Sequence, residues 1–376
     1  MTDRISMFAE SHAAEAEALL KELGRIPAPS HHEEQRASFV RDWFLSAGAN
    51  EVWIDDAGNV LCKFGCDRFD DITVFMAHMD IVFEDRTPIP MKQEGRILKA
   101  PGIGDDSANL VNLMMMTKYL IENQSRQSTG ILIAADTCEE GLGNSDGCRE
   151  IMENYGNRVK AFYSFDAYQG MRMNGAVGSH RHRIEILTEG GHSYRDFGND
   201  NAIAVAADLI RDLYSIPVPE EARTTYNVGR IEGGTTVNSI AESAVILYEY
   251  RSERESCLEQ MKSSFFSVIE KYRSAGKRIN VQVLGIRPAS CIQDPEGFAE
   301  WTDNNLRILK NYCPVEMICA PNSSDSNIPL SRGIFANTIG TIRGDLPHTR
   351  EEWVDLDSIP SGIAMACGLL EQYMNA

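Results

Sequence analysis

This sequence has no apolar run long enough to cross a bilayer and no start typical of a secretory signal. Residues 1–10 contain no basic region followed by a long apolar stretch, so we expect no signal peptide. The longest apolar patch, Leu110–Met116, is interrupted by Asn112 and falls far short of the roughly 20 residues of a membrane helix. These absences predict a protein with no membrane partner.

Paired cysteine motifs are missing as well. The nine cysteines are an odd number and are scattered singly along the chain. Cys62 and Cys66 are the closest two, and neither a histidine nor a second cysteine pair accompanies them. Unpaired thiols of this kind are typical of the reducing cytoplasm, which is the location that we expect.

Positive charge is in short supply. The chain has 36 lysines and arginines against 55 acidic residues, and its formal net charge is -19. A surface this acidic repels phosphate groups, so we expect no nucleic-acid partner. The charge is most simply explained by solubility. With 376 residues, 43% of them hydrophobic, the chain can build a sizeable core and favours two domains over one.

The first 175 residues alternate helix-like and strand-like segments. Residues 31–47 have helical spacing, residues 51–64 are typical of two short strands joined by a turn, and 107–122 predicts a buried helix. Three short, uniformly apolar runs are typical of interior strands in a sheet covered on both faces: Ile72–Ala77, Gly130–Ala135 and Val159–Phe165. The alternation predicts a mixed-sheet α/β/α sandwich.

A different order of elements begins near Arg181. Strands and helices are expected at 181–188 (strand), 200–214 (helix), 225–233 and 244–251 (strands), 253–274 (helix) and 279–285 (strand). This β-α-β-β-α-β order is the ferredoxin-like arrangement. The α/β pattern then resumes with a helix near 296–311, a strand near 334–341 and a helix near 357–374. We therefore predict a discontinuous domain, 1–180 plus 289–376, with an α+β domain inserted at 181–288.

Acidic residues and histidines follow four of the predicted strands. In open α/β sheets, ligands bind beyond the carboxyl ends of the strands, so these side chains should share one site. They are His78 and Asp80 after the first strand, Glu139 and Glu140 after the second, Asp166 after the third, and His348 in the loop after the strand at 334–341.

The spacing of these residues suggests which chemical role each of them has. In an extended segment, His78 and Asp80 lie on the same side, so a carboxylate can orient a metal-binding imidazole. Asp105 follows glycines just before the predicted buried helix, where we expect Asp106 or Ser107 to be the N-cap and Asp105 to be a ligand. Two adjacent glutamates after a strand repel each other unless a cation or a proton intervenes. That pairing indicates one ligand and one general acid/base, although a solvated acidic loop would explain the pair if it stood alone.

Taken together, these residues resemble the co-catalytic zinc hydrolases that include peptidase T, aminoacylase, succinyl-diaminopimelate desuccinylase and glutamate carboxypeptidase. The resemblance covers nearly the whole chain. It implies two divalent metal ions per subunit, zinc with cobalt or manganese as alternatives. It also implies the roles: Asp80 supports a ligand, Glu139 is the general base, and the metal ligands are His78, Asp105 (bridging), Glu140, Asp166 and His348.

The same resemblance extends to the inserted domain, as a lid that also forms a homodimer. Gly190–Ser193 resembles the family's lid motif, whose histidine, here His192, would polarise the scissile carbonyl in the partner subunit's site. Asn238 and Arg251 would bind substrate. Taken alone, His192 could be an ordinary turn residue and Arg251 a surface residue of a strand. The remaining histidines are assigned structural roles: His12, His31, His32, His180 and His182.

The substrate is less sharply indicated. Asp166, where some relatives have glutamate, and the sequence Glu232–Thr235 resemble the peptidase T-like members, so we predict a di- or tripeptide aminopeptidase. A deacylase of N-acyl amino acids is the alternative. A non-catalytic peptide- or metal-binding protein on the same fold is a second alternative, which an intact Glu139 argues against. Ser107–Asn109 departs from the Lys-Gly or Lys-Ala of many relatives and leaves substrate choice open.

Overall fold

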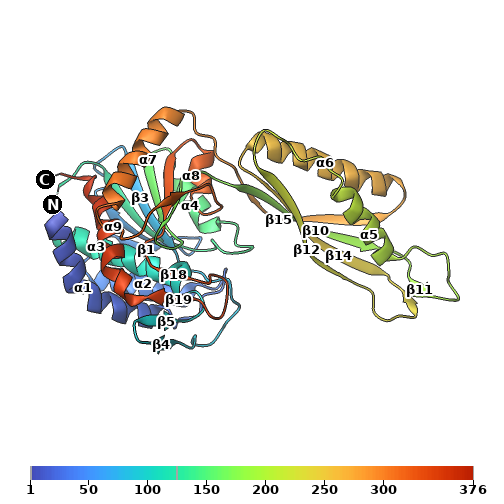
Figure 1. Ribbon diagram of the computed structural model, residues 1–376, viewed down its shortest axis with the longest axis horizontal. Coiled ribbons are helices and arrows are strands. Elements are labelled where there is room, and N and C mark those ends of the chain that lie inside the picture. The colour runs from blue at the N-terminus through green and yellow to red at the C-terminus, as the bar shows by residue number, and fades with distance from the viewer. Residues whose placement is uncertain (1, 124–125, 376) are drawn as a thin grey trace. The chain divides into compact units, whose positions relative to one another are not determined.

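The structure is a computed structural model that describes residues 2–123 and 126–375 (Figure 1). The chain divides into two compact units, one comprising Met1–Ala176 with Cys291–Ala376 and the other Val177–Ser290. The inserted unit starts earlier than the predicted 181–288 because its first strand already begins at Gly178. Among the described residues, no helix is long and apolar enough to cross a membrane.

The first unit is built on a mixed sheet of eight strands. In sheet order these are β1 (Val52–Ile54), β2 (Val60–Phe64), β7 (Gly130–Asp136), β3 (Ile72–His78), β8 (Val159–Phe165), β17 (Phe335–Ile339), β9 (Met171–Met173) and β16 (Ile318–Cys319). The central strands β7, β3, β8 and β17 are parallel, whereas β2 and β9 pair antiparallel with β7 and β17. The three apolar runs of the sequence are thus neighbouring central strands, as predicted.

Side chains of the central strands alternate between two cores. In β3, Phe75 and Ala77 face one core, whereas Val74 and Met76 face the other. The first core is covered by α1 (Thr2–Leu23), α2 (Glu34–Ser46), α3 (Asn109–Asn123) and α9 (Ile359–Glu371), with α7 (Pro295–Leu309) packed against α9 and β17. The second core is covered by α4 (Asp146–Tyr155) and α8 (Asn327–Ser331). The predicted α/β/α layering is confirmed.

A small second sheet in this unit was not predicted. Its order is β18 (Gly344–Asp345), β19 (Trp353–Asp355), β5 (Ile97–Lys99) and β4 (Lys92–Glu94). Strands this short show no sequence period by which to recognise them. The sheet joins distant parts of the chain, because β19 pairs with β5. The loop between β18 and β19 carries His348.

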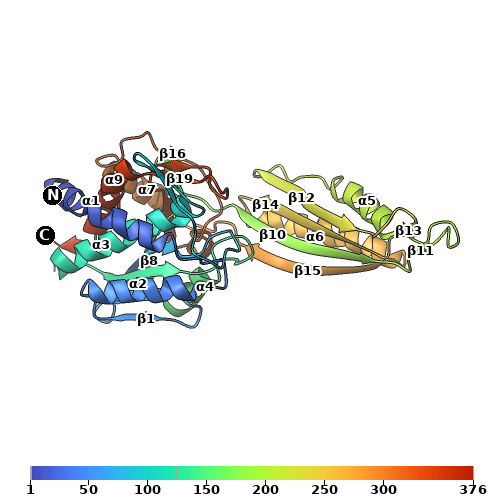
Figure 2. The same cartoon turned by 90° about the horizontal axis from the view of Figure 1, so that it is seen from below.

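The inserted unit follows the expected β-α-β-β-α-β order. Its elements are β10 (Gly178–Leu187), α5 (Ala202–Leu213), β12 (Thr224–Gly233), β14 (Ser243–Ser252), α6 (Glu255–Ser274) and β15 (Arg278–Arg287). The antiparallel sheet has the order β12-β14-β10-β15, and both helices lie on one side of it (Figure 2). Alternate side chains of β14, including Ile246 and Tyr248, are buried against these helices. Two short strands, β11 (Gly191–His192) and β13 (Ser239–Ile240), pair with each other. Along the chain, β11 follows β10 and β13 precedes β14.

Candidate metal centre

The parallel strands of the large sheet deliver polar residues to one edge. His78 is the last residue of β3 and lies opposite Asp136, the last residue of β7. Strand β8 flanks β3 on its other side, and Asp166 follows it directly. Glu139 and Glu140 lie in the loop after β7. The carboxyl ends of these strands therefore bring the side chains together, as the sequence predicted.

Asp105 lies between two histidines that are far apart in the sequence. Its Oδ1 is 3.1 Å from His78 Nε2, and its Oδ2 is 3.3 Å from His348 Nε2. The same His348 nitrogen is 3.2 Å from Glu140 Oε1. A carboxylate whose two oxygens face different imidazoles is arranged as a ligand that bridges two cations would be. His78, Asp105 and Glu140 form one group whose ligand atoms all lie within 4.8 Å of one another.

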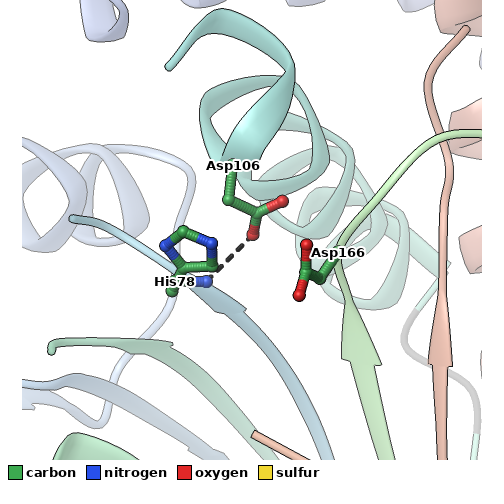
Figure 3. Close-up of side chains that lie close together, drawn as sticks. All are labelled: His78, Asp106 and Asp166. Atoms are coloured by element: carbon green, nitrogen blue, oxygen red, sulfur yellow. Dashed lines mark hydrogen bonds between the residues drawn. The ribbon is translucent and has the colours of Figure 1, made fainter. Parts of the chain in front are cut away.

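A second group of this kind consists of His78, Asp106 and Asp166, which Figure 3 shows turned toward one another. Asp106 Oδ2 accepts a hydrogen bond from the backbone N–H of His78 at 3.0 Å. The other oxygen of Asp106 is buried and has no hydrogen-bond partner among the described residues. Asp106 is therefore a candidate ligand that the sequence interpretation overlooked.

The expectation that Asp106 or Ser107 caps the buried helix was wrong. The backbone is non-helical at Asp105, so the helix begins again after it. Asp106 does not cap that helix, because its Oδ2 accepts from the backbone N–H of His78 and its Oδ1 has no hydrogen-bond partner among the described residues. The Ser107 hydroxyl instead donates to the backbone oxygen of Gly102 at 2.6 Å.

Asp80 is placed to hold the other groups in position. Its carboxylate accepts hydrogen bonds from the backbone N–H groups of Glu139 at 3.0 Å and Glu140 at 2.9 Å, and from the Ser30 hydroxyl at 2.6 Å. Its Oδ1 is also 3.3 Å from His78 Nδ1. Burial opposes ionisation, but the hydrogen bond and charge of His78, together with the hydrogen bonds from Ser30 and the Glu140 backbone, outweigh it and lower the pKa of Asp80. Asp80 thus orients an imidazole and both glutamates at once, which is how a group supporting a metal ligand acts.

The remaining carboxylates are crowded into a dry space. Burial, and then the charge of Asp105, raises the pKa of Asp166 to about 7, and the same two causes raise the pKa of Glu140. Hydrogen bonds to Asp105 and Glu140 raise the pKa of His348 to about 11, so a proton there supplies positive charge to this pair. A divalent cation would supply that charge with neutral histidines as ligands. The donor set of carboxylate oxygens and imidazole nitrogens therefore fits a divalent metal ion, and Zn²⁺, Co²⁺ and Mn²⁺ all accept such ligands.

The three remaining predicted residues lie in the inserted unit and do not all lie together. His192 on β11 is exposed, and its neighbour Ser193 donates its backbone N–H to the backbone oxygen of Asn238 at 3.1 Å. Arg251 lies near the far end of β14, paired in register with Ser179, and bonds to Glu249 at 3.0 Å. At about 3.3 Å per residue, β14 separates Arg251 from the β11-β13 pair by roughly 25 Å.

Sequence reasoning missed further contacts around the centre. His31, which the sequence suggested is structural, has its Nδ1 3.2 Å from the sulfur of Cys138, the residue before Glu139. Glu352 is fully buried and binds the loop that carries Asp105. Its position shortly after His348 was the available signal, but the pairing of β19 with β5 could not be foreseen from so short a strand.

Known proteins resemble this chain over most of its length. A model of peptidase family M20/M25/M40 matches residues 74–372. The Bacillus subtilis protein YqjE is 25% identical over 371 residues, which cover 93% of this chain and 96% of YqjE. A tripeptidase from Staphylococcus aureus has a TM-score of 0.76 at 20% identity, with 96% of this chain and 99% of that chain covered. Aminopeptidase PepT from Bacillus cereus has a TM-score of 0.72 at 20% identity, with 96% and 98% covered.

Proposed function

We propose that this chain, which belongs to peptidase family M20/M25/M40 and is a metal-dependent hydrolase, uses two divalent ions to cleave amide bonds in small peptides. The observation that carries the two-ion proposal is the placement of Asp105, whose two oxygens face different histidines. His78, Asp105 and Asp166 would hold one ion, with Asp106 as a further candidate ligand beside His78 and Asp166. Asp105, Glu140 and His348 would hold the other. Three protein ligands for each ion leave a position for water.

Glu139 is the proposed general base. The bound ions would supply Lewis acidity and bring the pKa of a water molecule down to about 7. Glu139 would take the proton of the attacking water and pass it to the leaving amine. The hydrogen bond from its backbone N–H to Asp80 supports this role, because it fixes the base in the same frame as the predicted ligands.

His192 is proposed to stabilise the oxyanion of the tetrahedral intermediate. Its Nδ1 lies 3.2 Å from the backbone nitrogen of Tyr194 and 3.4 Å from that of Arg195, and both N–H groups point to it. In the neutral imidazole, Nδ1 is then the acceptor and Nε2 carries the proton. An exposed ring with a proton on Nε2 is suited to donate to a carbonyl oxygen.

We further propose that the chain forms a homodimer in which His192 acts in the partner's site. The exposure of His192 supports this, because a group that completes another subunit's site must be accessible in the single chain. Zinc is the proposed native metal. A cytoplasmic location is proposed because all nine cysteines, which lie within the described residues, are free thiols.

The proposed substrates are unblocked di- and tripeptides. The support is the aspartate at position 166, the sequence Glu232–Thr235, and the fold shared with a tripeptidase and an aminopeptidase. The test compares unblocked dipeptides and tripeptides with N-acylated amino acids, each with added Zn²⁺, Co²⁺ or Mn²⁺. We expect turnover of the unblocked peptides. Turnover of the acylated compounds alone would identify the enzyme as a deacylase.

A further inference from the structure

The short strand β19 brings Glu352 beside the loop that carries Asp105. The residues are far apart in sequence, and Gly102 and Glu352 are separated by 250 positions. Strand β19 pairs with β5, and the backbone N–H of Ala100 donates to the backbone oxygen of Glu352 at 3.1 Å. Glu352 thus ends up facing the Gly102–Asp105 loop that follows β5. It is fully buried there.

The carboxylate of Glu352 accepts four hydrogen bonds. Oε2 accepts from the backbone N–H of Gly102 at 2.7 Å, and Oε1 accepts from those of Gly104 and Asp105, both at 2.7 Å. The Tyr168 hydroxyl donates to the same Oε1 at 3.1 Å. A Cβ added to Gly104 would lie 2.5 Å from the Tyr168 ring, so glycine lets the loop backbone come close to this ring. Glu352 therefore ties the Asp105 loop to Tyr168, which comes shortly after Asp166.

Asn109 makes a second connection of this kind. Its Nδ2 donates to the backbone oxygen of Gly104 at 3.2 Å and to that of Ala167 at 2.9 Å. Its Oδ1 accepts from the backbone N–H of Thr341 at 2.8 Å, and the side chain is fully buried. Gly104 and Ala167 are the chain neighbours of the two aspartates that are proposed to hold ions. Asn109 therefore joins the same two segments as Glu352.

We propose that Glu352 and Asn109 are positioning residues that fix the distance between Asp105 and Asp166, and thereby the spacing of the two ions. This rests on the proposed function, in which both aspartates are ligands. Two carboxylates in a dry site repel each other, so side chains that cross-link their backbones keep both pointed at a common cation before it binds. Neither side chain is required to touch substrate.

The test uses two nearly isosteric variants, Glu352→Gln and Asn109→Asp, on separate elements of the full-length chain. Glutamine turns an amide N–H₂ toward the backbone N–H groups, and aspartate removes both donors of Asn109. Zn²⁺ binding is measured by competition with a chelating dye, and the Mn²⁺-loaded proteins are compared by electron paramagnetic resonance, which reports the spacing of coupled ions. We expect each variant to bind the less tightly held of its two Zn²⁺ ions at least ~10-fold more weakly than the wild type does. We also expect the resonance signal of the coupled Mn²⁺ pair to change.

Matched controls separate positioning from loss of stability. Thr117→Val changes a buried α3 residue whose hydroxyl donates to the backbone oxygen of Leu113 at 2.9 Å, and Asp355→Asn changes a β19 carboxylate bonded to Arg343. Both controls should keep wild-type Zn²⁺ affinity even when their melting temperatures fall. Two tightly bound ions in the wild type with unchanged affinity in both test variants would overturn the positioning roles alone. A wild type that binds fewer than two ions would overturn the two-ion proposal as well.

Discussion

The two units place their predicted functional residues in opposite surroundings. In the first unit, His78 and Asp80 are 2% and 0% exposed, and the carboxylates around them are fixed by hydrogen bonds. In the second unit, His192 and Asn238 are exposed on a pair of short strands and the adjoining loop. The proposed ligands are buried or half-buried except for His348, which is exposed. Groups that meet a substrate, by contrast, must stay accessible to it. The contrast fits the proposal that the first unit holds the ions and the second supplies groups that meet the substrate.

The largest expected effect tests the first unit. Glu139→Gln should lower kcat by ~10²–10⁴ because it removes the general base. The metal content, measured by atomic emission, should stay at the wild-type value, since Glu139 is not a proposed ligand. Glu153→Gln on the exposed surface of α4 is the matched control and should keep full turnover. A metal-loaded Glu139→Gln enzyme with wild-type kcat would remove Glu139 from the mechanism.

The next effect tests whether the second unit completes a site elsewhere. His192→Ala should lower kcat by ~10²–10³ with metal binding unchanged, because it deletes an oxyanion donor. If His192 acts across a dimer, mixing this variant with Glu139→Gln restores one intact site in each heterodimer. Random exchange of subunits should then recover roughly a quarter of wild-type activity. No recovery in a sample shown by mass to contain heterodimers would place His192 in its own subunit's site.

The third prediction concerns the stability of the second unit at acid pH, which a buried histidine of that unit should lower. Burial, followed by the charge of His180, lowers the pKa of His182 to about 4 in the second unit. An unfolded histidine has a pKa of about 6.5, so the unfolded chain binds more protons between these values. The contribution of neutral His182 to the free energy of unfolding is complete above pH 6.5. It falls by up to about 3 kcal/mol as the pH drops toward 4. Hydrogen exchange should show β10 and β14 losing protection over this range.

The variant His182→Phe provides the control for that experiment. Phenylalanine cannot take up a proton and can keep the stacked contact with Phe265, whose ring centroid lies 4.5 Å from that of His182. We expect the acid-induced loss of protection in β10 and β14 to shrink. The same pH dependence in wild type and variant would show that His182 does not cause it.

The smallest expected effect concerns Arg251. If Arg251 binds substrate, Arg251→Ala should raise KM about tenfold with little change in kcat, because a charge-assisted hydrogen bond is lost. Arg183→Ala is a close control, since Arg183 bonds to Glu185 at 3.1 Å much as Arg251 bonds to Glu249 at 3.0 Å. Both pairs are part-exposed and add only ~0–1 kcal/mol to stability. Equal KM values for the two variants would make Arg251 a structural surface residue.

The sequence predicted the features that depend on local patterns. The apolar runs that became β3, β7 and β8 were visible as short, continuous stretches, and His78 and Asp166 could be placed at their ends. The ferredoxin-like order was equally readable. Helix α1 was overlooked, although Ile5, Phe8 and Leu19 show the helical spacing of a buried face.

What the sequence could not give depends on contacts between distant segments. Glu352 reaches the Asp105 loop only because β19, a strand of three residues, pairs with β5. A carboxylate before a helix is usually a cap, which is why the sequence predicted that role for Asp106, but its Oδ2 accepts from the backbone N–H of His78 on a distant strand. Contacts between distant segments therefore determine the details of the site. The sequence patterns predict only the strands at whose ends the site lies.

The central claim is that one carboxylate, Asp105, joins two ions in a single site. The direct measurement is the number of Zn²⁺ ions bound per chain in the wild type and in Asp105→Ala, with peptide turnover followed in the same samples. We predict two ions and full activity in the wild type, and loss of at least one ion together with activity in the variant. An active wild type with a single ion, or an Asp105→Ala chain that keeps two ions and wild-type turnover, would contradict it.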